Sequence, residues 1–190
     1  MKILAISGSL RQGSHNTDLL RGAAAAAPDG VDVTLYHGLK EIPPYDADDD
    51  IPGNQPAAVQ DFKTALDEAD AVLISTPEYN SSIPGVLKNA IDWASRPRAT
   101  TPLQGKPAAV IGATTGSFGA VWAQAELRKV LASTGARVID LDLAVARAHE
   151  AFDTGGALHS ADHGVRIDEI LEALAGEAER DAQLELARAA

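Results

Sequence analysis

The first residues in this chain that could do chemistry lie in a short polar segment, residues 7–17, which follows an apolar stretch and precedes an alanine- and leucine-rich one. Its glycines allow backbone N–H groups to converge, and the N-terminus of the helix expected next adds partial positive charge. Arg11 supplies a permanent, fork-shaped cation, and the hydroxyls of Ser9 and Ser14 and the amide of Asn16 complete a shell for a phosphate. The spaced glycines of a dinucleotide site and the lysine of a triphosphate loop are absent, so a single terminal phosphate fits best.

A second segment, residues 77–93, runs from a buried-looking strand into a helix through residues that a plain turn would not require. Residues 69–76 before it are mostly apolar, and open α/β sheets bind ligands where such strands end. Tyr79 offers an aromatic face with a polar tip, Asn80 tolerates unusual backbone angles, and Pro84 suits a first helical turn. The combination favours a planar ring lying on backbone, and the binding candidates are Pro77, Glu78, Tyr79 and Asn80.

A third segment, residues 112–119, ends another apolar stretch with glycines and small hydroxyl residues, whose size lets a ligand approach the backbone. Its binding candidates are Thr114, Thr115, Gly116 and Ser117. Each of the three segments alone could be an ordinary capped turn. Their succession after three apparent strands favours one shared site.

Around these segments, apolar strands and helices alternate along the chain, which predicts a parallel sheet covered on both faces. The expected strands are residues 2–6, 31–36, 69–76, 107–112 and 137–141, and the expected helices are 14–27, 55–68, 85–95, 118–133 and 167 to the tail. A chain of 190 residues is expected to form one domain over residues 1–190.

The sequence resembles the NADPH-dependent FMN reductases, which include quinone, azo-dye and chromate reductases on a flavodoxin-like fold. The resemblance rests on Gly8-Ser9-Leu10-Arg11 with Ser14 and Asn16, on Pro77-Glu78-Tyr79-Asn80, and on Leu87-Lys88-Asn89-Ala90-Ile91-Asp92-Trp93. It extends in outline from Met1 to about Leu143. It implies a three-layer α/β sandwich with a five-stranded parallel sheet in the order 2-1-3-4-5, so that the three polar segments open on one rim.

The resemblance also implies how these segments share a cofactor. The first would hold the phosphate of FMN, the second would carry the isoalloxazine ring, and the third would approach the pyrimidine edge of that ring. NADPH or NADH would donate hydride, and a quinone, azo compound, metal oxyanion or flavin would accept it. Because the cofactor does the redox chemistry, no side chain is nominated as acid, base or nucleophile. A flavodoxin-type electron carrier and a non-catalytic regulatory module remain as alternatives, although Arg11 departs from the neutral phosphate cradle usual in flavodoxins.

Composition restricts the other classes of function. The chain has no cysteine, which excludes disulfides, thiol nucleophiles and iron–sulfur or zinc–thiolate sites. A net charge of -11 and a pI near 4.7 argue against nucleic acid or an anionic membrane as a partner. With no leader before the first strand and no apolar run that could span a bilayer, a cytoplasmic protein is expected.

The helix expected over residues 85–95 bears on assembly. Its expected core stripe comprises Val86, Leu87, Ala90, Ile91 and Ala94. Trp93 falls on another face, where an exposed tryptophan indicates a partner surface. The corresponding helix of the family packs at a dimer interface, which implies a homodimer or a dimer of dimers. Trp122, on the next expected helix, is a further candidate for that interface. Asp92 and Arg96 are expected to pair along the same helix.

Two polar clusters faintly suggest a metal site, and neither is expected to be one. Residues 46–50 resemble the start of a calcium loop, but Gly53 comes too late and Ala57 stands where a glutamate is needed. His159, Asp162 and His163 lie in a glycine- and serine-containing stretch without a helical register, which favours a surface loop.

Overall fold

The computed structural model describes residues 1–51, 53–153, 156 and 158–189. A parallel sheet of five strands has the order β2-β1-β3-β4-β5, which confirms the predicted topology. The strands are β1 (Lys2–Ser7), β2 (Asp32–Tyr36), β3 (Ala71–Ser75), β4 (Pro107–Ala113) and β5 (Arg137–Val145). The chain moves outward from β1 to β2 and then returns to β3 on the other side of β1. This places the switch point, where α/β sheets bind ligands, between β1 and β3.

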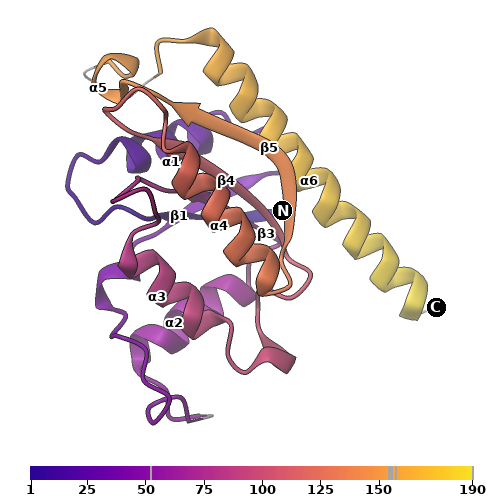
Figure 1. Cartoon of the computed structure of the whole chain (residues 1–190). Helices are drawn as coiled ribbons and strands as arrows, with labels where there is room; N and C mark the ends of the chain where they lie inside the picture. Colours follow the sequence, from indigo (N-terminus) through magenta and orange to yellow (C-terminus); the bar gives the residue numbers. More distant parts are fainter. Residues whose placement is uncertain (52, 154–155, 157, 190) are drawn as a thin grey trace.

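Helices cover both faces of the sheet, as Figure 1 shows. The helical segments are α1 (His15–Ala25), η1 (Gly38–Glu41), α2 (Ala57–Asp67), α3 (Gly85–Ala94), η2 (Arg98–Thr100), α4 (Val121–Ser133), α5 (Ala148–Ala151) and α6 (Ala161–Ala189). Alternate residues of β1 serve the two faces: Ile3 and Ala5 pack with α1 and α6, and Leu4 and Ile6 pack with α2, α3 and α4. The result is the predicted three-layer sandwich.

The strands β3 and β4 are buried throughout, because helices cover them on both sides. Every residue of β3 and of β4 is buried, which explains why both read as continuous apolar stretches. The edge strand β5 extends to Val145, beyond the predicted end at residue 141. Its pairing with β4 shifts register between Ala108 and Val110. The exposed Asp142, directly after the predicted end, interrupts the apolar pattern on which the prediction relied.

Two helix boundaries differ from the sequence-based expectation. The helix α4 begins at Val121 and not at residue 118, because Gly119 and Ala120 adopt left-handed backbone angles with φ of 59° and 61°. The helix α6 begins at Ala161, so Asp162 and His163 lie in a helix and not in the expected loop. Over the residues that the structure describes, no three histidine, aspartate or glutamate side chains gather as a metal site.

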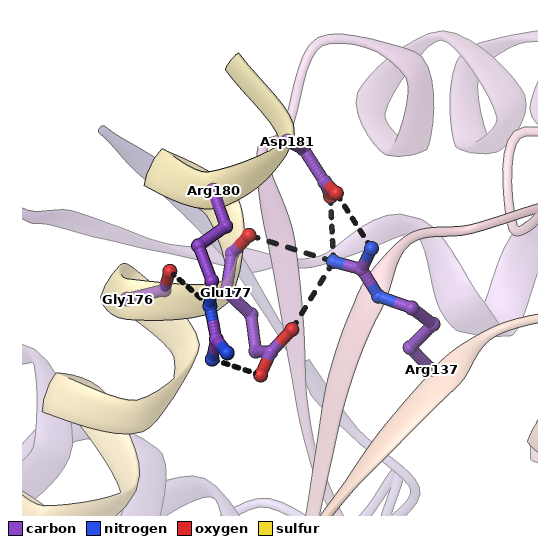
Figure 2. Close-up of polar contacts among 5 residues, drawn as sticks. All are labelled: Arg137, Gly176, Glu177, Arg180 and Asp181. Atoms are coloured by element: carbon purple, nitrogen blue, oxygen red, sulfur yellow. Dashed lines mark hydrogen bonds and ion pairs between the residues drawn. The ribbon is translucent and has the colours of Figure 1, made fainter. Parts of the chain in front are cut away.

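The last helix is held at its middle by an edge-strand arginine. Its first half packs on the sheet through buried apolar residues that end at Leu174, and its second half projects beyond the sheet (Figure 1). Arg137, the first residue of β5, donates to the two carboxylate oxygens of Asp181 at 2.5 and 2.6 Å and lies 3.5 Å from the carboxylate of Glu177 (Figure 2).

Among the described helices, none has the length and apolar character needed to cross a membrane.

Candidate active site

The three polar segments meet in one crevice of about 480 Å³ at the carboxyl edge of the sheet. They are the β1–α1, β3–α3 and β4–α4 loops, and their parent strands β1, β3 and β4 are neighbours. The crevice is lined by Ser9, Arg11, Ser14, His15, Asn16, Pro77, Glu78, Tyr79, Ala113, Thr114 and Thr115. All the predicted binding residues therefore lie at this crevice except Asn80, Gly116 and Ser117, which belong to the same loops but do not line it.

The β1–α1 loop presents an uncommitted cation at the start of a helix. The hydroxyl of Ser14 caps α1 by accepting from the backbone N–H of Asn16 at 3.2 Å. Arg11 is exposed, and its guanidinium makes a 3.4 Å contact with the carbonyl of Gln12. Because that contact is long and local, the guanidinium can turn toward an anion in the crevice.

Asn16, the second residue of α1, ties two neighbouring strands together beneath this loop. Its side-chain nitrogen donates to the carbonyl of Ala113 at 2.9 Å, and its oxygen accepts from the N–H of Ala113 at 2.9 Å and the hydroxyl of Ser75 at 2.8 Å. These bonds join the start of α1 to the ends of β3 and β4. Sequence reasoning assigned Asn16 to the ligand shell, and the structure adds a bracing role that spacing alone does not reveal.

The β3–α3 loop is a tight, strained turn that exposes an aromatic ring. Tyr79 and Ser82 exchange backbone hydrogen bonds of 2.9 and 3.1 Å, while Asn80 and Ser81 between them have φ of 53° and 61°. Left-handed angles at consecutive non-glycine residues are unfavourable and concentrate at ligand sites. The ring of Tyr79 is 53% exposed and lies at the crevice, where a planar ligand could contact it.

Glu78 links this loop to the next one. Its carboxylate accepts from the backbone N–H groups of Trp122 and Ala123, each at 3.2 Å. The residue that precedes α4, Ala120, provides no side-chain cap, so Glu78 caps that helix from a distant part of the chain. This contact fixes the β3–α3 loop, which lines the crevice, against the start of α4.

The β4–α4 loop is braced from the outer side by the chain that follows β5. Its Thr114 accepts at its carbonyl from the N–H of Ala148 at 2.9 Å, and Gly116 accepts from the N–H of Arg147 at 2.8 Å. These bonds direct Thr114 and Thr115 toward the crevice and leave Gly116 and Ser117 exposed outside its lining.

Sequence reasoning missed His15, which also lines the crevice. Its ring stacks on Phe152 with centroids 5.6 Å apart and planes inclined by 12°. Burial and then the charge of Arg11 lower the pKa of His15. Its place between Ser14 and Asn16 in the polar segment was the available signal.

The expected partner surface at Trp93 is wrong. The indole of Trp93 is fully buried, donates to the carbonyl of Pro43 at 2.9 Å and packs edge-on against Tyr45 with centroids 4.8 Å apart. The segment 42–45 covers this side of α3, which the helical pattern of α3 alone could not show. Two related expectations also fail, since Val86 is exposed and Asp92 pairs with Lys88 at 2.6 Å instead of pairing with Arg96.

Exposed aromatic rings occur instead beside the crevice. Phe118 and Trp122 are 62% and 50% exposed and pack edge to face with centroids 5.0 Å apart. Most of the large apolar side chains that are exposed in the described residues lie on the carboxyl-edge loops or the helix starts after them, namely Leu10, Tyr79, Val86, Phe118, Val121 and Trp122. Such a concentration marks a surface that contacts a ligand or a partner.

The sheet order and the crevice at its switch point define a flavodoxin-like α/β protein. Residues 1–150 match the family of NADPH-dependent FMN reductases. The chain is 44% identical over 159 residues to an NAD(P)H-dependent FMN reductase of Pseudomonas aeruginosa, covering 83% of this chain and 84% of the relative. It is 39% identical over 140 residues to a quinone reductase of Escherichia coli, covering 74% of each.

Among solved structures, the flavoenzyme NAD(P)H:(acceptor) oxidoreductase FerB of Paracoccus denitrificans superimposes with a TM-score of 0.81 at 33% identity, covering 94% of this chain and 97% of FerB. The chain belongs to the NADPH-dependent FMN reductase family. The predicted family, fold, enzyme class and cofactor class are therefore confirmed: this is an FMN-dependent NAD(P)H oxidoreductase.

Proposed function

We propose that the crevice binds FMN with its phosphate at the β1–α1 loop, its ring beside Tyr79 and its pyrimidine edge toward Thr114 and Thr115. The observation that carries this proposal is the convergence of the three loops on one crevice. The enzyme then passes hydride equivalents from NADPH or NADH to a small acceptor such as a quinone, an azo compound, a metal oxyanion or a flavin.

The residues present fit the chemistry of each part of FMN. A phosphate needs a cation and donors, which the lightly engaged Arg11, the hydroxyl of Ser9 and the start of α1 supply. The isoalloxazine needs a flat apolar contact, which the half-exposed ring of Tyr79 supplies. Bound FMN supplies a two-electron acceptor and donor, so the chain needs only to bind, orient and shield.

Different residues bind the cofactor and hold the loops in place. Arg11 anchors the anionic end, while Asn16 and Glu78 keep the three loops at fixed separations. Since these loops converge on a single crevice, nicotinamide donor and acceptor share one landing place. We therefore expect the donor to leave before the acceptor enters.

The test uses steady-state kinetics and rapid mixing of the holoprotein. Double-reciprocal plots of NADPH oxidation at several fixed quinone concentrations should be parallel, and NADPH alone should bleach the oxidised flavin under anaerobic conditions. Intersecting plots without bleaching would require a ternary complex and contradict the single-crevice account. A holoprotein with no NADPH oxidation at all would favour an electron carrier or a regulatory module.

We also propose a homodimer, joined through Phe118 and Trp122 and not through Trp93. The exposed aromatic pair lies beside the crevice and would be self-complementary about a two-fold axis. Trp122→Glu should yield monomer by light scattering. Val165→Glu, at an exposed residue of α6, is the matched control and should leave the mass unchanged. If the Trp122→Glu variant remains a dimer, this interface is refuted.

The proposed location is the cytoplasm, which supplies nicotinamide donors.

A further inference from the structure

His15 occupies an unusual position for an imidazole. It is the first residue of α1, directly after the capping residue Ser14, and it lines the crevice beside Arg11. Its ring is partly buried and held against Phe152, with planes only 12° apart. Its Nδ1 atom is buried and has no hydrogen-bond partner within the part of the chain that the structure describes. A buried ring nitrogen without a partner is unfavourable unless a ligand or a proton changes its surroundings.

The charges that face His15 come from three elements. Arg11 in the preceding loop and His149 in α5 disfavour a second positive charge, whereas Asp18 in α1 favours it. Asp18 is already paired with Arg21 at 2.8 Å, and His149 lies 3.2 Å from Glu150. In the protein alone, burial and Arg11 outweigh Asp18 and lower the pKa of His15. A proton on the imidazole is therefore disfavoured in the free protein.

We propose that His15 takes up a proton from solvent when a phosphate monoester occupies the β1–α1 loop, so that phosphate recognition is linked to pH. The inference deepens the proposed function and rests on it, because FMN is the monoester. A phosphate carries nearly two negative charges at neutral pH, which reverses the sign of the field that Arg11 imposes. The protonated ring then adds a second cation to the cradle while it remains stacked on Phe152.

The sign of the linkage follows from these two states. Protonation is disfavoured in the free protein and favoured in the complex, so the contribution of His15 to affinity grows as the pH falls through the range between its free and bound pKa values. The phosphate of FMN itself titrates near pH 6, by about the same amount whether or not His15 is present. Comparison with a variant that lacks the imidazole removes this background.

The matched variant is His15→Phe, which keeps an aromatic ring against Phe152 but cannot bind a proton. Isothermal titration of apoprotein with FMN near pH 7, in two buffers of different ionisation enthalpy, counts protons taken up. Wild type should take up on the order of half a proton more per FMN than His15→Phe. The affinity advantage of wild type should grow on the order of tenfold between pH 8.5 and pH 6. Riboflavin, which lacks the phosphate, should show neither difference, and His37→Gln, at an exposed histidine, should behave as wild type.

Equal proton counts and parallel pH profiles for wild type and His15→Phe, with FMN bound by both, would overturn the inference and leave the proposed function intact. A protein that binds no FMN would overturn both. If His15→Phe does not fold, the imidazole resonances of wild-type protein give the pKa of His15 with and without FMN. A rise on FMN addition supports the linkage, and an unchanged value overturns it.

Discussion

The turns at the two edges of the sheet use different residue types where the backbone is left-handed. At the amino edge, the turns that need left-handed backbone use glycine, as at Gly135 between α4 and β5. At the carboxyl edge, such angles are also taken by residues with side chains: Asn80, Ser81, Ala120 and Arg147. These are all the non-glycine residues with positive φ in the described chain. The unfavourable conformations thus gather at the edge of the sheet that carries the crevice, although none of these four residues lines it.

The two edges also differ in whether their cationic side chains already have partners. The amino edge has the larger hollow, of about 720 Å³, yet its cations are engaged. Lys106 donates to the carbonyl of Ala69, and Arg137 is bound by Asp181. At the carboxyl edge, Arg11 has only a long contact to its neighbour among the interactions described. An uncommitted cation therefore distinguishes the candidate site better than the size of a cavity does.

The largest expected effect comes from a glycine of the carboxyl edge that packs directly against backbone. A Cβ atom added to Gly119 would lie 2.5 Å from the carbonyl carbon of Ala144, and the φ of 59° is left-handed. Because the obstacle is backbone, Gly119→Ala should lower the free energy of unfolding by about 3 kcal/mol or more, measured by urea denaturation.

The matched amino-edge variant is Gly135→Ala. Its added Cβ would meet the flexible side chain of Gln104, which can rotate away, so the loss should be only about 1–2 kcal/mol. A loss at Gly135 equal to that at Gly119 would show that the two edges are equally constrained.

The second prediction removes the contact between the β3–α3 loop and the start of α4. Glu78→Ala leaves two N–H groups at the start of α4 without their acceptor, so the free energy of unfolding should fall by about 1–2 kcal/mol. FMN affinity, followed by flavin fluorescence, should fall as well.

Arg137→Ala is the amino-edge counterpart. It removes partly exposed ion pairs and should lower stability by about 0–1 kcal/mol without changing FMN affinity. If both variants weaken FMN binding equally, the crevice does not depend on Glu78 in particular.

The smallest expected effect comes from a substitution that relieves backbone strain in the β3–α3 loop. Ser81→Gly places glycine at a left-handed, exposed position and should raise the free energy of unfolding by about 0.5–1 kcal/mol in thermal denaturation. Ser133→Gly, in the last turn of α4, should lower it by a similar amount because its backbone is helical. A loss of stability in Ser81→Gly would mean that the loop is not strained in the protein.

The sheet was predictable because its signals are local. Short, continuous apolar runs such as 107–112, bounded by glycine and polar residues, favour strands buried on both faces, and the polar residues after them mark the carboxyl edge. Local patterns placed Arg11 and Tyr79 just after apparent strands, and the strand order implied by the family resemblance brought their loops to one crevice.

The features that the sequence did not predict depend on contacts between segments that are far apart in the chain. Nothing near Trp93 in the sequence shows that Pro43 covers it, and nothing near Glu78 shows that it caps α4. The register shift in β5 and the left-handed Ala120 likewise depend on the packed neighbours of these residues. Spacing identifies which residues can share a site, but tertiary packing decides which of them bind ligand and which brace the loops.

The most direct test of the carboxyl-edge site compares FMN with riboflavin in wild type and in Arg11→Ala. A charge-assisted hydrogen bond to phosphate contributes about 1.5–3 kcal/mol. Fluorescence titration should therefore show FMN binding weakened by that amount in the variant, while riboflavin affinity is almost unchanged. Equal weakening for both flavins, or none for either, would show that Arg11 does not read the phosphate and would contradict the proposed orientation of FMN in the crevice.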